Sequence, residues 1–262
     1  MREIGYLRLS VPEEYASVHV QPHLYRDWFC GNAARRYIQY CRRPLEVISQ
    51  LPIKPGDRVL DVGCGWGYAS MLVNSRGAQA FGIDIEEEAI AFGRALARAN
   101  GFIVDLRCGD ARRLDYPDGY FDHIISIETF EHIPAEERQL VLLEMKRCVR
   151  DNGRIVISTP NRLGTAELAK SILGRSRRIR QLMEPGTDWG DKHPMVSSKE
   201  MIDLIRSVGL TLEKLKHIIF MVKFMPDSLF SLALNVERTL EALPFVSRFG
   251  ATSIYVIRKK ML

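Results

Sequence analysis

Residues 59–67 of the chain read Val-Leu-Asp-Val-Gly-Cys-Gly-Trp-Gly, an apolar run that passes into a glycine-rich turn. The run is typical of a buried strand, and residues 69–74 after the turn are typical of a helix. Glycines let the backbone turn tightly and come close to a bound molecule. Because ligands of open parallel sheets bind at the carboxyl ends of the strands, this turn is the first candidate for a binding site.

Short apolar runs alternate with helical patterns throughout residues 59–158. Continuously apolar strands separated by helices predict an α/β fold, a parallel sheet covered on both faces in a three-layer sandwich. Two later runs, at 212–220 and 253–258, bring the sheet to seven strands, mostly parallel. The other strands are expected at 59–62, 80–84, 104–107, 121–126 and 154–158. Helices are expected at 86–100, after Pro134, after the S-x-x-E capping box at 197–200, and at 227–243.

The composition is that of a globular protein: the chain has 262 residues, of which 46% are hydrophobic and 26% charged. These values exclude a disordered, collagenous or coiled-coil chain. We expect one domain at residues 46–262, preceded by an N-terminal helical lid at residues 1–45. Inserts are expected at about residues 161–195 and 220–250.

The sequence contains no obvious membrane-spanning or export segment. Its longest apolar run, residues 218–222, is far shorter than the roughly 18 residues of a membrane span, and charged residues interrupt the first 14 positions. The five cysteines are widely spaced and form no C-x-x-C pair, so we expect reduced thiols rather than disulfides or a zinc framework. A cytoplasmic location is therefore expected.

Two common nucleotide-binding patterns do not fit the glycine turn. A dinucleotide fingerprint would need glycine or alanine where the chain has Tyr68, and a phosphate-binding loop would need Gly-Lys-Ser/Thr. The turn is instead combined with Asp61 in the first strand and with Asp84, 23 residues later, at the end of the second. A carboxylate in the position of Asp84 can accept both hydroxyls of a ribose. Asp110 and Ala111 follow the third strand, where they can meet the edge of an adenine.

In these four elements, residues 55–160 resemble the class I S-adenosylmethionine-dependent methyltransferases. The resemblance implies a Rossmann-like sheet whose last strand is antiparallel, and S-adenosyl-L-methionine as the cofactor. It further implies that the cofactor's methionine part, ribose and adenine are contacted in that order along the sheet edge. The implied cofactor-binding residues are Asp61, Gly63, Gly65 and Gly67 for the methionine part, Asp84 and Ile85 for the ribose, Asp110 and Ala111 for the adenine, and Ile127 beneath the cofactor.

A second cluster of chemically active residues, Glu128-Thr129-Phe130-Glu131-His132, follows the fourth strand. If this segment is one helical turn, Glu128, Glu131 and His132 share a face. Oxygen and nitrogen ligands suit a divalent metal such as Mg²⁺, and a distant His193 is a candidate fourth ligand. The alternative is a strand-end turn without metal, which the three residues alone leave equally open. Glu131 and His132 are the candidate catalytic residues, with His132 as general base if no metal is bound.

This second cluster also resembles two groups within the class. They are the UbiG-type ubiquinone-biosynthesis O-methyltransferases and the small-RNA 2′-O-methyltransferases, which share an E-x-x-E-H motif and a divalent metal. The ubiquinone group is also similar at residues 158–162 and 186–193. Residues 32–38 resemble its N-terminal arginine segment, which implies that Arg35 pairs with the cofactor's carboxylate. The resemblance ends after Phe220.

Signals for the acceptor are limited to composition. Residues 162–180 interleave basic residues with Leu and Ile, a pattern that suits peripheral contact with an anionic membrane or with RNA phosphates. The insert at 220–250 is rich in Phe, Met and Leu and could roof a lipophilic site, although core packing is the favoured interpretation. The first hypothesis is O-methylation of a hydroxylated, quinone-like lipophilic small molecule. The alternatives are an RNA 2′-O-methyltransferase, less favoured without an accessory nucleic-acid module, and a non-catalytic S-adenosylmethionine-binding protein.

Overall fold

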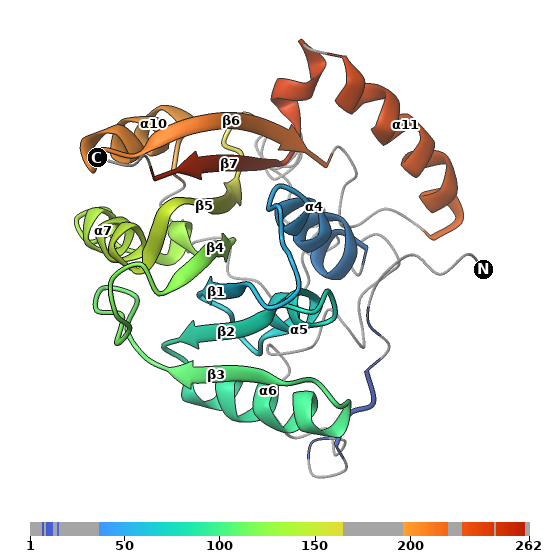
Figure 1. The fold of residues 1–262 in the computed structure, drawn as a ribbon. Coiled ribbons are helices and arrows are strands. Elements are labelled where there is room, and N and C mark those ends of the chain that lie inside the picture. The colour runs from blue at the N-terminus through green and yellow to red at the C-terminus, as the bar shows by residue number, and fades with distance from the viewer. Residues whose placement is uncertain are drawn as a thin grey trace.

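The computed structural model describes residues 7, 9–12, 15, 37–164, 196–219, 227–243 and 245–259. Its centre is one seven-stranded sheet with the order β3-β2-β1-β4-β5-β7-β6 (Figure 1). The strands are β1 (Arg58–Val62), β2 (Gln79–Asp84), β3 (Val104–Cys108), β4 (Phe121–Ile127), β5 (Val149–Pro160), β6 (Thr211–Ile218) and β7 (Thr252–Arg258).

Strands β3, β2, β1, β4 and β5 run parallel, and β7 is antiparallel to both of its neighbours, β5 and β6. This arrangement confirms the expected α/β fold with its antiparallel last strand. Strand β6 ends at Ile218, earlier than expected, because Ile219 has a left-handed backbone with a φ of +71°. An extended strand cannot continue through that conformation.

Helices cover both faces of the sheet and complete three layers. The helices α4, α5 and α6 pack on one face, and α7 and α10 pack on the other. The α-helices are α4 (Arg43–Ser49), α5 (Tyr68–Asn74), α6 (Glu87–Ala99), α7 (Arg138–Cys148), α10 (Ser198–Ser207) and α11 (Phe230–Ala242). The shorter turns are the π-helix η1 (Ile38–Arg42) and the 3₁₀ turns η2 (Phe130–His132), η3 (Asp227–Leu229) and η4 (Val246–Phe249).

The sheet is buried on both sides, which explains the continuous apolar runs of its strands. Successive residues of a strand face opposite sides. In β1, Val59 joins the core beneath α4, α5 and α6, whereas Leu60 and Val62 join the core beneath α7 and α10. The polar side chain of Asp61 interrupts this pattern within the strand and is buried too.

The first described helix widens into a π turn just before a proline. The backbone N–H of Arg43 donates to the carbonyl of Ile38, five residues earlier, and Pro44 follows directly. A proline ring clashes with the carbonyl four residues back in a regular helix, and the wider turn relieves that clash. The helix passes through the boundary predicted between residues 45 and 46. The N-terminal lid stays a prediction, since few residues before Tyr37 are described.

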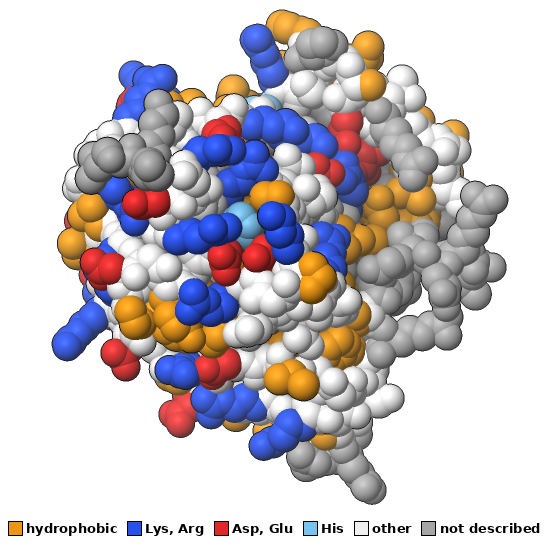
Figure 2. Space-filling model, in the orientation of Figure 1, with side chains coloured by type: hydrophobic (Ala, Val, Ile, Leu, Met, Phe, Trp, Pro, Cys, Tyr) orange, Lys and Arg blue, Asp and Glu red, His pale blue; other side chains and the backbone are white. Residues whose placement is uncertain are grey.

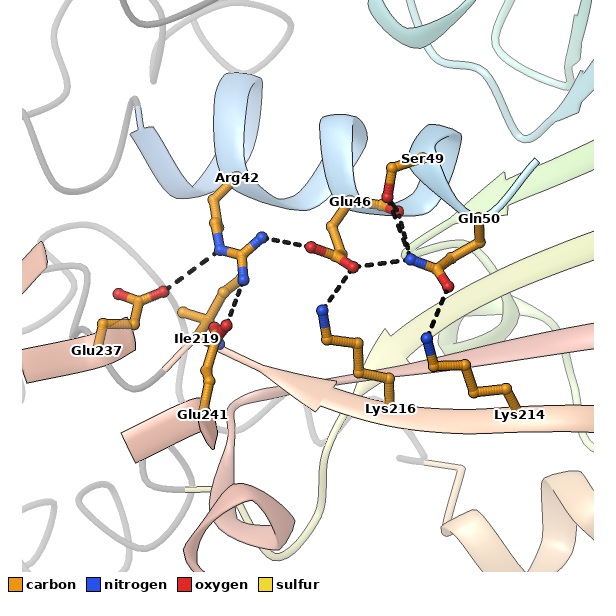
Figure 3. Close-up of polar contacts among 9 residues, drawn as sticks. All are labelled: Arg42, Glu46, Ser49, Gln50, Lys214, Lys216, Ile219, Glu237 and Glu241. Carbon is orange, nitrogen blue, oxygen red and sulfur yellow. Dashed lines mark hydrogen bonds and ion pairs between the residues drawn. The ribbon is translucent and has the colours of Figure 1, made fainter. Parts of the chain in front are cut away.

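A network of charges fixes α4 to β6 and α11 (Figure 3). The guanidinium of Arg42 pairs with Glu46, 2.6 Å away on α4, and with Glu237 and Glu241 on α11. Glu46 in turn pairs with the ammonium of Lys216 on β6 at 2.6 Å. Because Arg42 and Glu46 are largely shielded from solvent, these pairs are screened less than surface ion pairs.

The second predicted insert contains α11, at the β6 side of the molecule (Figure 1). Its apolar residues face two ways. Phe230 and Leu234 pack against the core, and Phe230 meets the ring of Tyr37 edge-on at 5.5 Å. Leu232 and Val236 are exposed, and Figure 2 shows hydrophobic side chains on the part of the surface where α11 lies. Core packing therefore accounts for one side of this helix only.

The first predicted insert, at 161–195, lies mostly outside the described residues, as does the basic segment 162–180. Among the helices that the structure does describe, none combines the length and the apolar character needed to cross a bilayer. The described cysteines at positions 41, 64, 108 and 148 are free thiols.

We expect Ser197→Ala to lower the free energy of unfolding by about 1 kcal/mol, because Ser197 caps α10. Its hydroxyl accepts the N–H of Glu200 at 3.2 Å, and the Glu200 carboxylate accepts the N–H of Ser197 at 2.7 Å. Urea denaturation would measure the loss. Ser207→Ala in the same helix is the control, with an expected change within about 0.5 kcal/mol. Equal losses in the two variants would contradict the capping role.

Candidate functional site

The glycine turn sits where predicted, between β1 and α5. Gly63, Gly65 and Gly67 all have a left-handed backbone, with φ values of +73°, +53° and +78°. A Cβ on Gly63 would lie 2.2 Å from the Thr129 side chain, and one on Gly67 would lie 2.7 Å from Leu106. Nothing lies within 4 Å of a Cβ on Gly65, so the backbone there borders open space that a ligand can approach.

Asp84, at the end of β2, ties this turn to the next strand. One carboxylate oxygen accepts the N–H of Gly65 at 2.7 Å, and the other accepts the N–H of Glu86 at 3.0 Å. Each oxygen keeps a second lone pair, so the carboxylate can also accept hydroxyl groups. The next residue, Ile85, is 72% exposed and places a large apolar side chain at the surface beside Asp84.

Asp61 is the deepest acid of the site, with 2% of its surface exposed. Burial raises the pKa of Asp61 to about 7, the charge of Asp84 adds to the rise, and the hydroxyl of Ser70, which donates at 3.1 Å, opposes it. Burial also raises the pKa of the neighbouring Cys64 thiol well above its usual range. A carboxylate in this state is stabilised by any cation that binds next to it.

Asp110 and Ala111 follow β3 at the same edge. The N–H of Gly109 donates to the carbonyl of Asp84 at 2.9 Å, which keeps the two loops together. Arg112 holds the Asp110 carboxylate at 2.6 Å and also pairs with Glu137 at 2.5 Å. The hydrogen bonds from Arg112 lower the pKa of Asp110. Sequence reasoning missed Arg112, because nothing in its spacing marks a partner of Asp110.

The cluster after β4 differs from the expected helical turn. Glu128 has a left-handed backbone with a φ of +53°, and the 3₁₀ turn η2 begins after it, at Phe130. Glu131 is buried whereas His132 is exposed, so these two side chains do not share a face. Within the described ranges, no three His, Cys, Asp or Glu side chains group as metal ligands. The predicted fourth ligand, His193, lies outside those ranges, as does Arg35.

A buried arginine takes part in this cluster instead. Arg43 of α4 lies 3.1 Å from one carboxylate oxygen of Glu128, and the hydroxyl of Ser158 donates to the other at 3.0 Å. Both oxygens of Glu128 therefore have a protein partner, one of them a cation. This donor set does not fit a divalent metal at Glu128, and we derive no chemistry through one. Arg43 was missed because it stands in a polar N-terminal segment without a motif.

Glu131 is more deeply buried than Glu128, with 4% of its surface exposed. One of its carboxylate oxygens is fully shielded and has no hydrogen-bond partner among the described residues. Burial raises the pKa of Glu131, and the charge of Glu128 raises it further. Ile127, the last residue of β4, is half-buried between this cluster and the core. The site thus joins the glycine turn, bordered by Asp61 and Asp84, to a buried acid with a raised pKa.

We expect Gly63→Ala to lower the free energy of unfolding by about 2–4 kcal/mol, because the new methyl group would overlap Thr129 and force a left-handed alanine. Gly56→Ala is the matched control, since Gly56 has a φ of +87° but nothing within 4 Å of its Cβ. In Gly56→Ala only the cost of a left-handed alanine remains, which should lower the free energy of unfolding by about 1–2 kcal/mol. Urea denaturation of both variants gives the cost of the overlap as the difference between their losses in free energy of unfolding. Equal losses would contradict this prediction and would show that the Thr129 side chain moves aside.

Comparisons with known proteins agree with this geometry. A family model described as a methyltransferase domain matches residues 60–157. A ubiquinone biosynthesis O-methyltransferase of Pseudomonas aeruginosa is 33% identical over 156 residues, which are 59% of this chain and 65% of that protein. The chain therefore spans slightly less than two thirds of that relative. A protein of the same name from Rhizobium etli is 31% identical over 185 residues, 71% of this chain and 68% of the relative.

A solved structure with the same fold is a SAM-dependent methyltransferase from Aquifex aeolicus. It has a TM-score of 0.59 and 14% identity, and the match covers 90% of this chain and 97% of that one. At 14% identity, this likeness shows the fold alone. Membership of a family is shown by the match to the relative from Rhizobium etli and to the family model. The chain belongs to the class I S-adenosylmethionine-dependent methyltransferases.

Proposed function

We propose that the protein transfers a methyl group from S-adenosylmethionine to a hydroxyl oxygen of a small molecule. The observation that carries this proposal is the edge formed by Asp61, Gly65 and Asp84. There a backbone bordered by open space lies between a carboxylate free to accept hydroxyl groups and a buried acid that a cation would stabilise. A donor that carries both a ribose and a positive charge matches these two acids, because Asp84 can accept the ribose hydroxyls and Asp61 is stabilised by the charge.

Each residue of this edge has a role in the proposal. Gly65 leaves room for the donor to lie against the backbone, and Asp84 accepts its ribose hydroxyls. Asp61 faces the positively charged methionine part, where its charge becomes favourable. When bound, S-adenosylmethionine supplies a methyl group on a positively charged sulfur, which leaves as a neutral thioether. The protein's contribution is to hold the acceptor oxygen in line with that methyl group.

The acceptor hydroxyl must lose its proton as the new C–O bond forms. Glu131 is the general base that we propose, because burial raises its pKa to about 8, and a carboxylate with a raised pKa is a stronger base than an ordinary one. His132 is the alternative base, more exposed and next in the chain. The proton passes to the carboxylate or imidazole, and the donor's C–S bond breaks.

We propose a lipophilic, quinone-like acceptor. The exposed apolar residues of α11, together with exposed Leu243 and Phe245 after it, offer a surface that would favour an apolar molecule. The name of the two curated relatives points to the same class of acceptor. Peripheral membrane contact through residues 162–180 and a cytoplasmic location remain predictions. RNA methylation and cofactor binding without transfer remain alternative outcomes.

The expected result of incubating the protein with methyl-labelled S-adenosylmethionine and cell extracts is label in the lipid or small-molecule fraction. Label in RNA would support the RNA alternative, and binding without transfer would support a non-catalytic role. With an acceptor identified, Glu131→Gln is expected to lower kcat roughly 10²–10⁴-fold with little change in KM. Glu136→Gln, an exposed acid nearby, is the control, and an equal kcat for both variants would remove Glu131 from the reaction.

We expect the affinity for S-adenosylmethionine to rise about tenfold between pH 6 and pH 8 and then to level off. Without ligand the pKa of Asp61 is raised to about 7, so much of it is protonated at pH 6. A positively charged ligand favours the ionised form, and binding below pH 7 must therefore release a proton. Titration calorimetry in two buffers would detect that proton, and Asp61→Asn should weaken binding and remove this pH dependence. A wild-type affinity independent of pH would contradict the role of Asp61.

A further inference from the structure

Glu128 is held in a strained conformation by three contacts around it. Its φ of +53° is uncommon for a residue with a side chain. Its N–H donates to the carbonyl of Ser158 at 3.0 Å, and the Ser158 hydroxyl donates to its carboxylate at 3.0 Å. The third contact is the guanidinium of Arg43 at 3.1 Å. Backbone strain of this kind persists where the surroundings over-determine a side chain's direction.

Arg43 is itself fixed on several sides. It is 6% exposed, and it comes from α4 rather than from the sheet. Its Nε donates to the hydroxyl of Thr252 at 3.3 Å, and one terminal nitrogen donates to the side-chain carbonyl of Gln39 at 2.9 Å. The other terminal nitrogen faces Glu128. Because each of its nitrogens has a partner, the guanidinium of Arg43 is held in one position beside Glu128.

A second buried arginine, Arg138 at the start of α7, contacts the turn that carries Glu131. The Nε of Arg138 is hydrogen-bonded to the backbone carbonyls of Phe130 and Ile133 at 3.1 and 3.0 Å. In the described part of the chain, Arg43 pairs directly with the carboxylate of Glu128, and Arg138 holds the backbone of η2.

We propose that Arg43 is the resident cation of this acidic cluster, standing where a divalent metal would otherwise balance Glu128 and Glu131, and that it positions Glu128 at the acceptor side of the site. A metal bound to Glu128 would need oxygen ligands at about 2.0–2.6 Å, next to a guanidinium already in contact with the same carboxylate. Two such cations side by side in a buried region repel each other strongly. The arginine and the metal are thus mutually exclusive occupants.

This inference rests on the proposed function for its catalytic consequence only, which is turnover that does not need a divalent metal. Methyl transfer measured in EDTA should equal that measured in Mn²⁺. Charge balance at the cluster can be tested without cofactor or acceptor. A failure to bind S-adenosylmethionine in a parallel titration would overturn the proposed function and leave the test of Arg43 intact.

The test is the melting temperature of the protein with Mn²⁺ or with EDTA. Wild type should give the same Tm in both. Arg43→Met leaves the half-buried Glu128 and the buried Glu131 without their cation, so its Tm should be lower in EDTA and should rise by about 5 °C with Mn²⁺, which can now occupy the cluster. Adding Glu128→Gln to Arg43→Met should abolish the response, because it removes the carboxylate that the ion would bind.

Two further variants keep the inference falsifiable. Arg43→Lys retains the positive charge and should remain insensitive to Mn²⁺, even if Arg43→Met does not fold. Arg154→Met removes a different ion-paired arginine, bound to Glu213 at 2.9 Å, and controls for losing any such pair, with no response to Mn²⁺ expected. One equivalent of Mn²⁺ bound by wild type and lost in Glu128→Gln would overturn the inference. So would a folded Arg43→Met protein that responds to Mn²⁺ no more than wild type.

Discussion

The contact between the Asp84 carboxylate and the N–H of Gly65, 2.7 Å long, is the interaction on which the site depends. It joins the turn after β1 to the end of β2, and the carbonyl of Asp84 accepts the N–H of Gly109 to bring in the loop after β3. Three loops from different parts of the chain therefore meet at one residue, Asp84. The parallel register of β1, β2 and β3 brings their carboxyl ends to one edge, and Asp84 fixes the loops there.

The edge concentrates acids that water would normally keep ionised. Asp61 and Glu131 are both buried, and burial raises the pKa of each. These two acids have different neighbours. The hydroxyl of Ser70 donates to Asp61, whereas the positive charge of Arg43 acts on Glu131. Asp61, with no resident cation, is available to a charged ligand, whereas Glu131 has a raised pKa because its burial and the charge of Glu128 outweigh the opposing charge of Arg43. In the proposed function, the same sheet edge therefore binds a cation at one end and accepts a proton at the other.

How much of this the sequence predicts depends on whether a feature is local. The sheet, the turn at residues 63–67 and the capping box before α10 follow from periodicity and short motifs, and all were predicted correctly. The arrangement around Glu128 was not, because spacing alone suggested a helical turn where the backbone is left-handed. Arg43 and Arg112 were missed for a related reason. Each meets its carboxylate through tertiary packing or loop geometry, which no residue spacing encodes.

The neighbouring residues Arg42 and Arg43 connect the N-terminal helix to two different parts of the protein. The π turn ends between them, and their side chains serve different networks. Arg42 binds the acids of α11 and so fixes the element that borders the proposed acceptor side, while Arg43 reaches Glu128 at the end of β4 (Figure 3 shows the first of these networks). In the proposed function, the cofactor contacts come from the sheet edge. In that proposal, Arg42 and Arg43 of a helix outside the sheet support the acceptor side, so acceptor preference can change with that helix while the cofactor edge stays the same.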